Sequence, residues 1–450
     1  MTIFQKLFLH KKGIINVFFL LSVVSLVWRQ GSIYTGSVKI SELLVFFTLA
    51  FILSCILFSK ENVSFLKVLV KKYIPYFFLI FFFAFIGNIF SSFEFSGIAF
   101  YKVNIILDYL RMFFVFLFFF LTLYVIIKSP EIIKHILIGI AISPLIFWLA
   151  IFPKFQSFFL NSGRLRGAEN DANYFATWIV LGIIISLFFA FFYNNQKIRW
   201  PWIINLFFVF PLLLWTGSRG AWVSVFLSIS LLFFLYFFKR ENFLVFVKRC
   251  LLVISIFIFS AFFTFYILPH ESRVMLLYRT VYPLINNSAF SREVENQNSF
   301  LSLNSKEMKF EPKLFAFGQD RQDLWVSALY GFITHPTGYG FSYSNWKPLA
   351  VLIGDIKQGS HNLFLEIGLT FGWGGLIVFL LFYMSIIKKS FGLIRKHKEF
   401  PYGIVLFVLL SSLFISSLFL DTITLRWMWF IFGAIVSYDF VLNKNEKLNV

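Results

Sequence analysis

Long apolar runs recur along the whole chain, and they constrain its fold more than any other feature. Many reach roughly 18 residues, which is enough for one helix to cross a ~30 Å hydrocarbon core. Backbone inside lipid must satisfy its own hydrogen bonds, and these runs lack the ~10-residue alternation of barrel strands. Only 14% of the residues are charged, against ~25% in ordinary soluble domains. The sequence therefore predicts an all-α, polytopic membrane protein.

We predict twelve transmembrane helices. The first apolar run follows a basic start and lacks a small-residue cleavage site, so we interpret it as a helix and not as a signal peptide. The predicted helices lie near residues 14–28, 41–58, 74–92, 109–127, 136–152, 174–193, 201–216, 221–238, 250–268, 362–387, 402–420 and 425–441.

Lys and Arg are unevenly distributed between these predicted helices. More than half of the 40 fall on the alternate segments that include both termini, which predicts cytoplasmic termini. We therefore divide the chain into helices one to nine (1–268), a large periplasmic or extracellular loop (269–361), and helices ten to twelve with a cytoplasmic tail (362–450). The net charge of +19 is scattered between helices and forms no compact basic domain, so nucleic acid is not an expected partner.

Arginines gather on the predicted outer face. Arg164 and Arg166 precede helix six, Arg219 lies in a tight turn between helices seven and eight, and Arg321 lies in the large loop. A guanidinium presents a fork of donors that fits phosphate oxygens. These residues are candidates for binding a polyanionic ligand. The alternatives are a loop charge in water, or an arginine that reaches headgroups or pairs with a carboxylate.

The large loop itself contains two kinds of sequence. Residues 286–313 are polar and predict a mobile surface segment. Asp320 is a suitable N-cap for an amphipathic helix that His335-Pro336 would end, and we expect this helix on the membrane interface or on the bundle. Its predicted apolar face combines Leu324, Ala328 and Phe332 with Trp325, Leu329 and Ile333.

His361 begins the next apolar run and is a candidate general base, since an unperturbed imidazole titrates near pH ~6.5. The alternative is a helix-start histidine that only hydrogen-bonds the loop. Gly368 and Gly372 have the spacing that lets a neighbouring helix approach closely. For His335 we favour a structural role.

Other chemistry lacks support in the sequence. Neither Glu169-Asn170-Asp171 nor Glu293-Val294-Glu295 has a companion His or Cys cluster, so no metal is expected. A Gly-rich nucleotide loop and a nucleophile elbow are also missing from the sequence. Asp108 and Arg111 are predicted to pair within helix four.

Four motifs in order resemble the O-antigen ligase/polymerase family of bacterial membrane glycosyltransferases. They are Ser218-Arg219-Gly220-Ala221-Trp222; Arg321-Gln322-Asp323-Leu324-Trp325 with His335-Pro336-Thr337-Gly338-Tyr339-Gly340; His361-Asn362 with Glu366, Gly368 and Gly372-Trp373-Gly374-Gly375; and, more loosely, Arg166-Gly167 with Asn173. The polar segment 286–313 departs from a minimal family loop.

This resemblance implies a polyprenyl-diphosphate-linked glycan as donor and a hydroxyl of lipid A core or of a glycan as acceptor. It also implies an enzyme of the bacterial inner membrane, active on the periplasmic face without cofactor, metal or nucleotide. By motif position the catalytic residues are Arg219, Arg321 and His361. Arg219 and Arg321 are expected to hold the diphosphate, with Arg164 or Arg166 assisting.

Ligase activity is the interpretation that we favour slightly over polymerase activity. A flippase for lipid-linked glycans remains an alternative, because twelve helices with both ends inside is also a transporter layout. Transporters, however, place ionisable residues near the bilayer midplane, whereas the candidates here cluster at the outer edge. A non-catalytic subunit of polysaccharide assembly is a further alternative.

Overall fold

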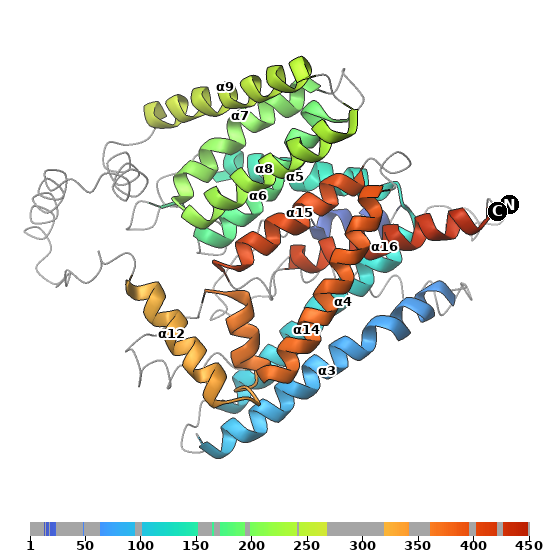
Figure 1. Cartoon of the computed structure of the whole chain (residues 1–450), viewed down its shortest axis with the longest axis vertical. Helices are drawn as coiled ribbons and strands as arrows, with labels where there is room; N and C mark the ends of the chain where they lie inside the picture. Colours follow the sequence, from blue (N-terminus) through green and yellow to red (C-terminus); the bar gives the residue numbers. More distant parts are fainter. Residues whose placement is uncertain are drawn as a thin grey trace, which may run out of the picture.

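The computed structural model describes residues 64–94, 101–151, 164–165, 172–193, 199–240, 243–267, 319–341, 361–395, 402–420 and 426–448, with scattered positions between 13 and 48. Its helices, shown in Figure 1, are α3 (Ser64–Glu94), α4 (Tyr101–Lys128), α5 (Ile132–Ile151), α6 (Ala172–Phe191), α7 (Arg199–Thr216), α8 (Arg219–Arg240), α9 (Phe243–Ile267), α12 (Gln319–Thr334), α14 (Leu363–Arg395), α15 (Tyr402–Ser417) and α16 (Arg426–Leu448). The predicted all-α class is confirmed.

Ten of the predicted transmembrane helices, from 74–92 to 425–441, each coincide largely with one described helix. Seven of the described helices are long and apolar enough to cross a membrane, and α15 and residues 427–443 are shorter apolar helices. Predicted helix 14–28 is described only at residues 15–17 and 19–23, predicted helix 41–58 only at residue 48, and most of the loop 269–361 falls outside the described residues. The number twelve, the three-part division and the orientation stay predictions.

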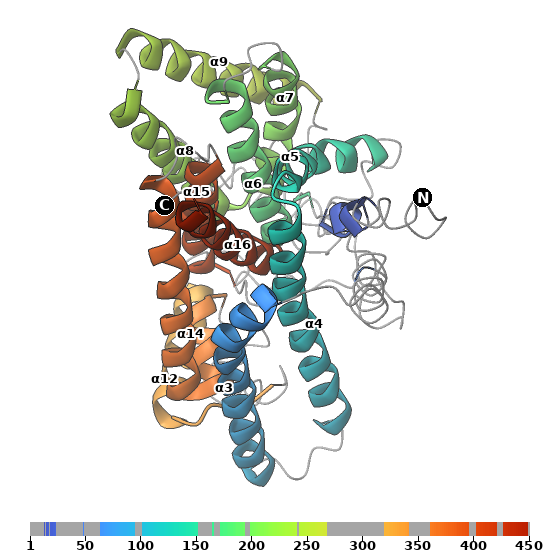
Figure 2. The same ribbon diagram turned by 90° about the vertical axis from the view of Figure 1, so that its right-hand side faces the viewer.

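Helix α15 joins two groups of helices. On one side α6 packs against α5 and α7, and α7 packs against α9; on the other, α14 packs against α3, and α16 against α4. Helix α15 contacts α6 and α8 as well as α14 and α16. Figure 2 shows α3, α12 and α14 toward one end of the molecule and α7 and α9 toward the other.

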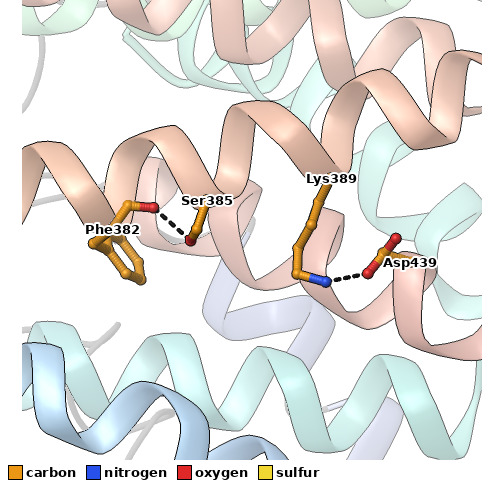
Figure 3. Close-up of polar contacts among 4 residues, drawn as sticks. All are labelled: Phe382, Ser385, Lys389 and Asp439. Carbon is orange, nitrogen blue, oxygen red and sulfur yellow. Dashed lines mark hydrogen bonds and ion pairs between the residues drawn. The ribbon is translucent and has the colours of Figure 1, made fainter.

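Polar side chains connect α15 and α16 to their neighbours. Ser224 of α8 donates a hydrogen bond to the Ser412 carbonyl (3.0 Å), and Ser416 donates to the Ser224 hydroxyl (3.2 Å). Lys389 of α14 forms an ion pair with Asp439 of α16 (Figure 3). Such interhelical bonds hold apolar helices together where lipid supplies little hydrophobic drive. The predicted pair of Asp108 and Arg111 is also present, at 2.7 Å.

Helix α14 is broken, which corrects the prediction of one continuous helix over 362–387. Gly372 has φ 65° and ψ −167°, a conformation that glycine adopts readily because it has no Cβ. Residues 363–371 form the first segment of α14, and residues 373–395 form the second. The predicted pairing of Gly368 and Gly372 is therefore wrong for Gly372. Gly368 does permit close approach, since a Cβ there would lie 2.6 Å from the Phe332 ring.

The predicted amphipathic helix is present as α12. It begins at Gln319, one residue before the predicted cap, and ends at Thr334, before His335. The prediction of one apolar face is wrong in part, because Ala328 and Phe332 pack against α14 whereas Trp325, Leu329 and Ile333 are exposed. The helix therefore lies on the bundle, as Figure 1 also shows.

Candidate active site

The turn between α7 and α8, residues 216–222, carries Arg219 and is called the arginine turn. Gly217 has φ 57°, which lets the chain reverse within two residues. Thr216 donates to the Leu213 carbonyl (2.7 Å) and accepts from the Ser218 amide (3.3 Å). These bonds end α7 and start α8 at fixed positions. Arg219 is therefore the first residue of α8, with an exposed side chain.

Arg164 holds this turn from the neighbouring polar stretch. Its Nε donates to the Thr216 carbonyl and its Nη2 donates to Asn173 Oδ1, both at 2.7 Å. The next residue, Leu165, donates its amide to the Trp215 carbonyl at 2.8 Å. Arg164 is thus a half-buried arginine that ties α6 to the arginine turn, and not a loop charge in water. Arg166 lies outside the described residues.

A small pocket opens beside the arginine turn. It is formed by the start of α6, the first turn of α8 and the end of α15. Hydroxyl and amide groups, a phenyl ring and a leucine all contribute to its lining. The lining residues are Asn173, Thr177, Ser218, Gly220, Ala221, Ser416, Phe419 and Leu420.

His361 lies at the same end of α15, just before α14. Its successor Asn362 caps the helix, since Oδ1 accepts from the Phe364 and Leu365 amides (3.0 and 3.1 Å). The Asn362 Nδ2 donates to the Leu418 carbonyl at 3.2 Å. His361 has φ 50°, a region that few side chains other than Asn, Asp and His enter. The backbone of His361 is therefore held at the start of α14, next to the Asn362 cap.

The arginine turn and the His361-Asn362 motif both contact the residues at the end of α15. Asn362 bonds Leu418, and the Cβ position of Gly220 lies 3.0 Å from Phe419. Because Gly220 follows Arg219 and Asn362 follows His361, the structure places the arginine turn and the start of α14 against three consecutive residues, 418–420. This arrangement gives a cationic group and an imidazole one common support.

Residues 204–380 match the family model described as O-Antigen ligase. These residues belong to the O-antigen ligase family. The resemblance predicted from the motifs is thus confirmed. Together with the apolar helices, the match supports a multi-pass membrane protein of the ligase/polymerase type. No curated protein matches the chain.

The O-antigen ligase region contains all three predicted catalytic residues: Arg219, Arg321 and His361. Arg321 lies in the first turn of α12, and its side chain is outside what the structure describes. Its place in the site stays a prediction. Arg164 precedes the matched region, although it contacts residue 216 within it.

His335 also lies within residues 204–380, and its ring contacts the residues of the turn after α12. Its Nδ1 is hydrogen-bonded to the Thr334 hydroxyl (3.0 Å) and to the Tyr339 hydroxyl (2.5 Å), and its ring lies 4.4 Å from the Tyr339 ring. These contacts close the turn that follows α12. They agree with the structural role that we favour for this histidine.

The end of α15 is the part of the site that motif reasoning missed. Ser416, Phe419 and Leu420 line the pocket, yet they belong to none of the motifs. The serines that interrupt the apolar run 402–420 were an available signal, because hydroxyls in such a run mark contacts with other helices.

Among the described ranges, no group of three or more His, Cys, Asp and Glu residues could hold a metal ion, and independence from metal stays a prediction.

Proposed function

We propose that the protein transfers a glycan from a polyprenyl diphosphate to the hydroxyl of an acceptor, and that this acceptor is lipid A core. The observation that supports this most is the meeting of the arginine turn with His361-Asn362 at residues 418–420. A polymerase of the same family, with a growing glycan as acceptor, is the alternative. The proposed location is the bacterial inner membrane, with the site facing the periplasm.

The donor's diphosphate is the group that the arginines recognise in this proposal. Arg219 is exposed at the first residue of α8, where the helix N-terminus also favours an anion. Arg321 supplies the second guanidinium. Arg164 acts one step away, because its donors to Thr216 and Asn173 hold the arginine turn in place. Charge on the departing diphosphate is thereby stabilised by positioned cations.

His361 acts as the general base. The acceptor oxygen forms a bond to the anomeric carbon, and its proton passes to the imidazole. The bond from that carbon to the phosphate oxygen breaks, and the polyprenyl diphosphate leaves with the electron pair. The left-handed backbone at His361 (φ 50°) adjoins the Asn362 cap that fixes the start of α14. General-base catalysis of this kind contributes ~10²–10⁴ in rate.

The test uses the purified full chain in liposomes with a labelled polyprenyl-diphosphate oligosaccharide. Lipid A core and lipid-linked glycan are offered as acceptors, with no nucleotide or metal added. We expect label on lipid A core. Longer lipid-linked glycans would instead establish a polymerase, and label that only crosses the bilayer would establish a transporter.

The decisive variant is His361→Asn, because asparagine also tolerates positive φ but cannot act as the base. We expect the rate to fall by ~10²–10⁴ while the variant unfolds at the wild-type temperature. His135→Asn, at an exposed position on α5, is the matched control and should transfer at the wild-type rate. Equal rates for His361→Asn and wild type would refute the role of His361.

A further inference from the structure

The segment after α12 completes the broken helix α14. At the break, the Leu369 and Thr370 carbonyls accept from the Tyr339 and Gly340 amides (2.7 and 2.8 Å). The Trp373 amide, which an unbroken helix would direct to Leu369, donates instead to the Pro336 carbonyl (2.9 Å). Residues 336–341 are called the clamp segment. The clamp segment therefore supplies the hydrogen-bond partners that the break removes.

Glycines allow the clamp segment to approach α14 and α3 closely. Gly338 has φ 74°, and a Cβ there would lie 2.3 Å from the Gly372 amide nitrogen. Gly340 has φ 78°, and its Cβ would lie 2.3 Å from the Asn88 side chain. A Cβ on Gly87 of α3 would lie 2.5 Å from the Gly340 nitrogen. The clamp segment is thus in backbone contact with both α14 and α3.

Asn88 fixes the far end of the clamp segment. Its Nδ2 donates to the Phe341 carbonyl (2.8 Å), and its Oδ1 accepts from the Phe341 amide (3.0 Å). Tyr109 of α4 donates to the same oxygen at 3.1 Å. Asn88 is 8% exposed, and a buried amide is costly unless it is hydrogen-bonded in this way. One side chain of α3 therefore pairs with the loop backbone as a neighbouring strand would.

We propose that Asn88 is a positioning residue for glycosyl transfer, an inference that rests on the function proposed above. The clamp segment follows α12 directly, and Arg321 lies in the first turn of α12. The same segment bonds the first segment of α14, whose start carries His361. Through Asn88 and the clamp segment, Arg321 and His361 belong to one rigid unit that is anchored to α3.

The test exploits the near-identical shape of asparagine and aspartic acid. In Asn88→Asp a carboxylate cannot donate to the Phe341 carbonyl, whereas the protonated acid can. The competent form is the acid, so the clamp is present at low pH and lost as pH rises through the pKa of residue 88. We expect transfer about 10-fold below wild type at pH 8, recovering toward wild type as pH falls to 5.

Other titratable groups near this position require the comparison to be made with wild type at each pH. They are Tyr109 and the Asp108–Arg111 pair on α4, His335 and Tyr339 around the clamp segment, and Glu366 on α14. Asn88→Leu is the matched control, because its side chain is similar in size but lacks hydrogen bonds. Its transfer should be reduced by the same factor at every pH.

A second measurement does not depend on transfer. Spin labels at exposed Leu329 of α12 and Leu381 of α14, in a chain with Cys55 and Cys250 replaced by serine, report the distance between the two helices. We expect a narrow distribution in wild type, a broad one in Asn88→Leu, and one in Asn88→Asp that narrows as pH falls.

A wild-type distance distribution in Asn88→Asp at pH 8 would overturn the clamp. A broadened distribution together with full transfer would overturn the positioning role of Asn88. If the distances change as expected but the wild-type protein transfers no glycan, the proposed function is refuted and the anchoring by Asn88 stands.

Discussion

The arginine turn and the clamp segment both hold a piece of the candidate site, but they do so by different means. The arginine turn is fixed mainly by one side chain, since Arg164 bonds the Thr216 carbonyl and Asn173. The clamp segment is fixed by three main-chain bonds to α14 and by Asn88. The turn joins adjacent helices through two residues, whereas the clamp segment closes a long insert and must offset a larger loop entropy.

This difference teaches that the two regions should respond differently to substitution. A side-chain anchor can be weakened in steps, because a shorter or less charged group retains part of its bonding. The clamp segment cannot be weakened in steps in this way, because any side chain at Gly338 brings its Cβ into contact with other backbone. Four substitutions separate these behaviours.

Arg219→Lys should have the largest effect on transfer. Lysine keeps the charge but loses the guanidinium fork, and we expect the rate to fall about 10²-fold, as for loss of one positioned donor. The measurement is initial rate at saturating donor. Arg111→Lys, which alters an exposed ion pair on α4, is the control and should be neutral. Full activity of Arg219→Lys would show that a point charge is enough at this position.

Gly338→Ala should have the next largest effect, and it should affect folding as well as rate. Its φ of 74° and the 2.3 Å contact with the Gly372 nitrogen force the clamp segment off α14, at a cost of about 1–3 kcal/mol. Thermal unfolding in detergent measures this. Gly392→Ala is the matched control, since its nearest contact is 3.8 Å away and alanine favours the helix by about 1 kcal/mol. Equal unfolding temperatures for both variants would argue against the clamp.

Arg164→Met should have an intermediate, graded effect. It removes both donors and leaves the Thr216 carbonyl and Asn173 without those bonds, which costs about 1–3 kcal/mol. We expect transfer to fall severalfold with Arg219 still in place. Lys71→Met on the exposed surface of α3 controls for loss of positive charge. If Arg164→Met matched the loss in Arg219→Lys, Arg164 would contact the diphosphate itself.

Ser416→Ala should have the smallest effect. It removes the bond to Ser224 (3.2 Å) at the edge of the pocket, at a cost of about 1 kcal/mol. We expect a lower unfolding temperature with transfer within about twofold of wild type. Ser411→Ala, whose hydroxyl bonds only within its own helix, is the matched control. A large loss of transfer in Ser416→Ala alone would place this hydroxyl in contact with substrate.

Sequence reasoning located the arginine turn well because its signal is local. An arginine between Trp215 and Trp222 in apolar surroundings marks a helix end, and the structure ends α7 and starts α8 there. The helix over residues 320–334 was predictable for the same reason, from its apolar spacing and from Pro336. The similarity of residues 204–380 to the O-antigen ligase family was also predictable, from short motifs.

The clamp was not predictable in this way. The Gly368 and Gly372 spacing indicates helix packing, and nothing local distinguishes a helical Gly372 from one with φ 65°. What decides its conformation is the clamp segment, which approaches from elsewhere in the chain. Asn88 carries a similar lesson, since a single amide in an apolar run identifies no partner until the fold brings Phe341 beside it.

The separation of Asn88 from Phe341 also has a consequence for biogenesis. The two residues lie 253 positions apart, and translation at 5–20 residues per second separates their synthesis by roughly 10–50 s. During that interval α3 is already made while its amide has no loop to bind. Tyr109, only 21 positions later, reaches the Asn88 oxygen first. The bundle of α3 and α4 can therefore be stabilised early by this tyrosine, and the attachment of the clamp segment becomes a late step in assembly of the enzyme.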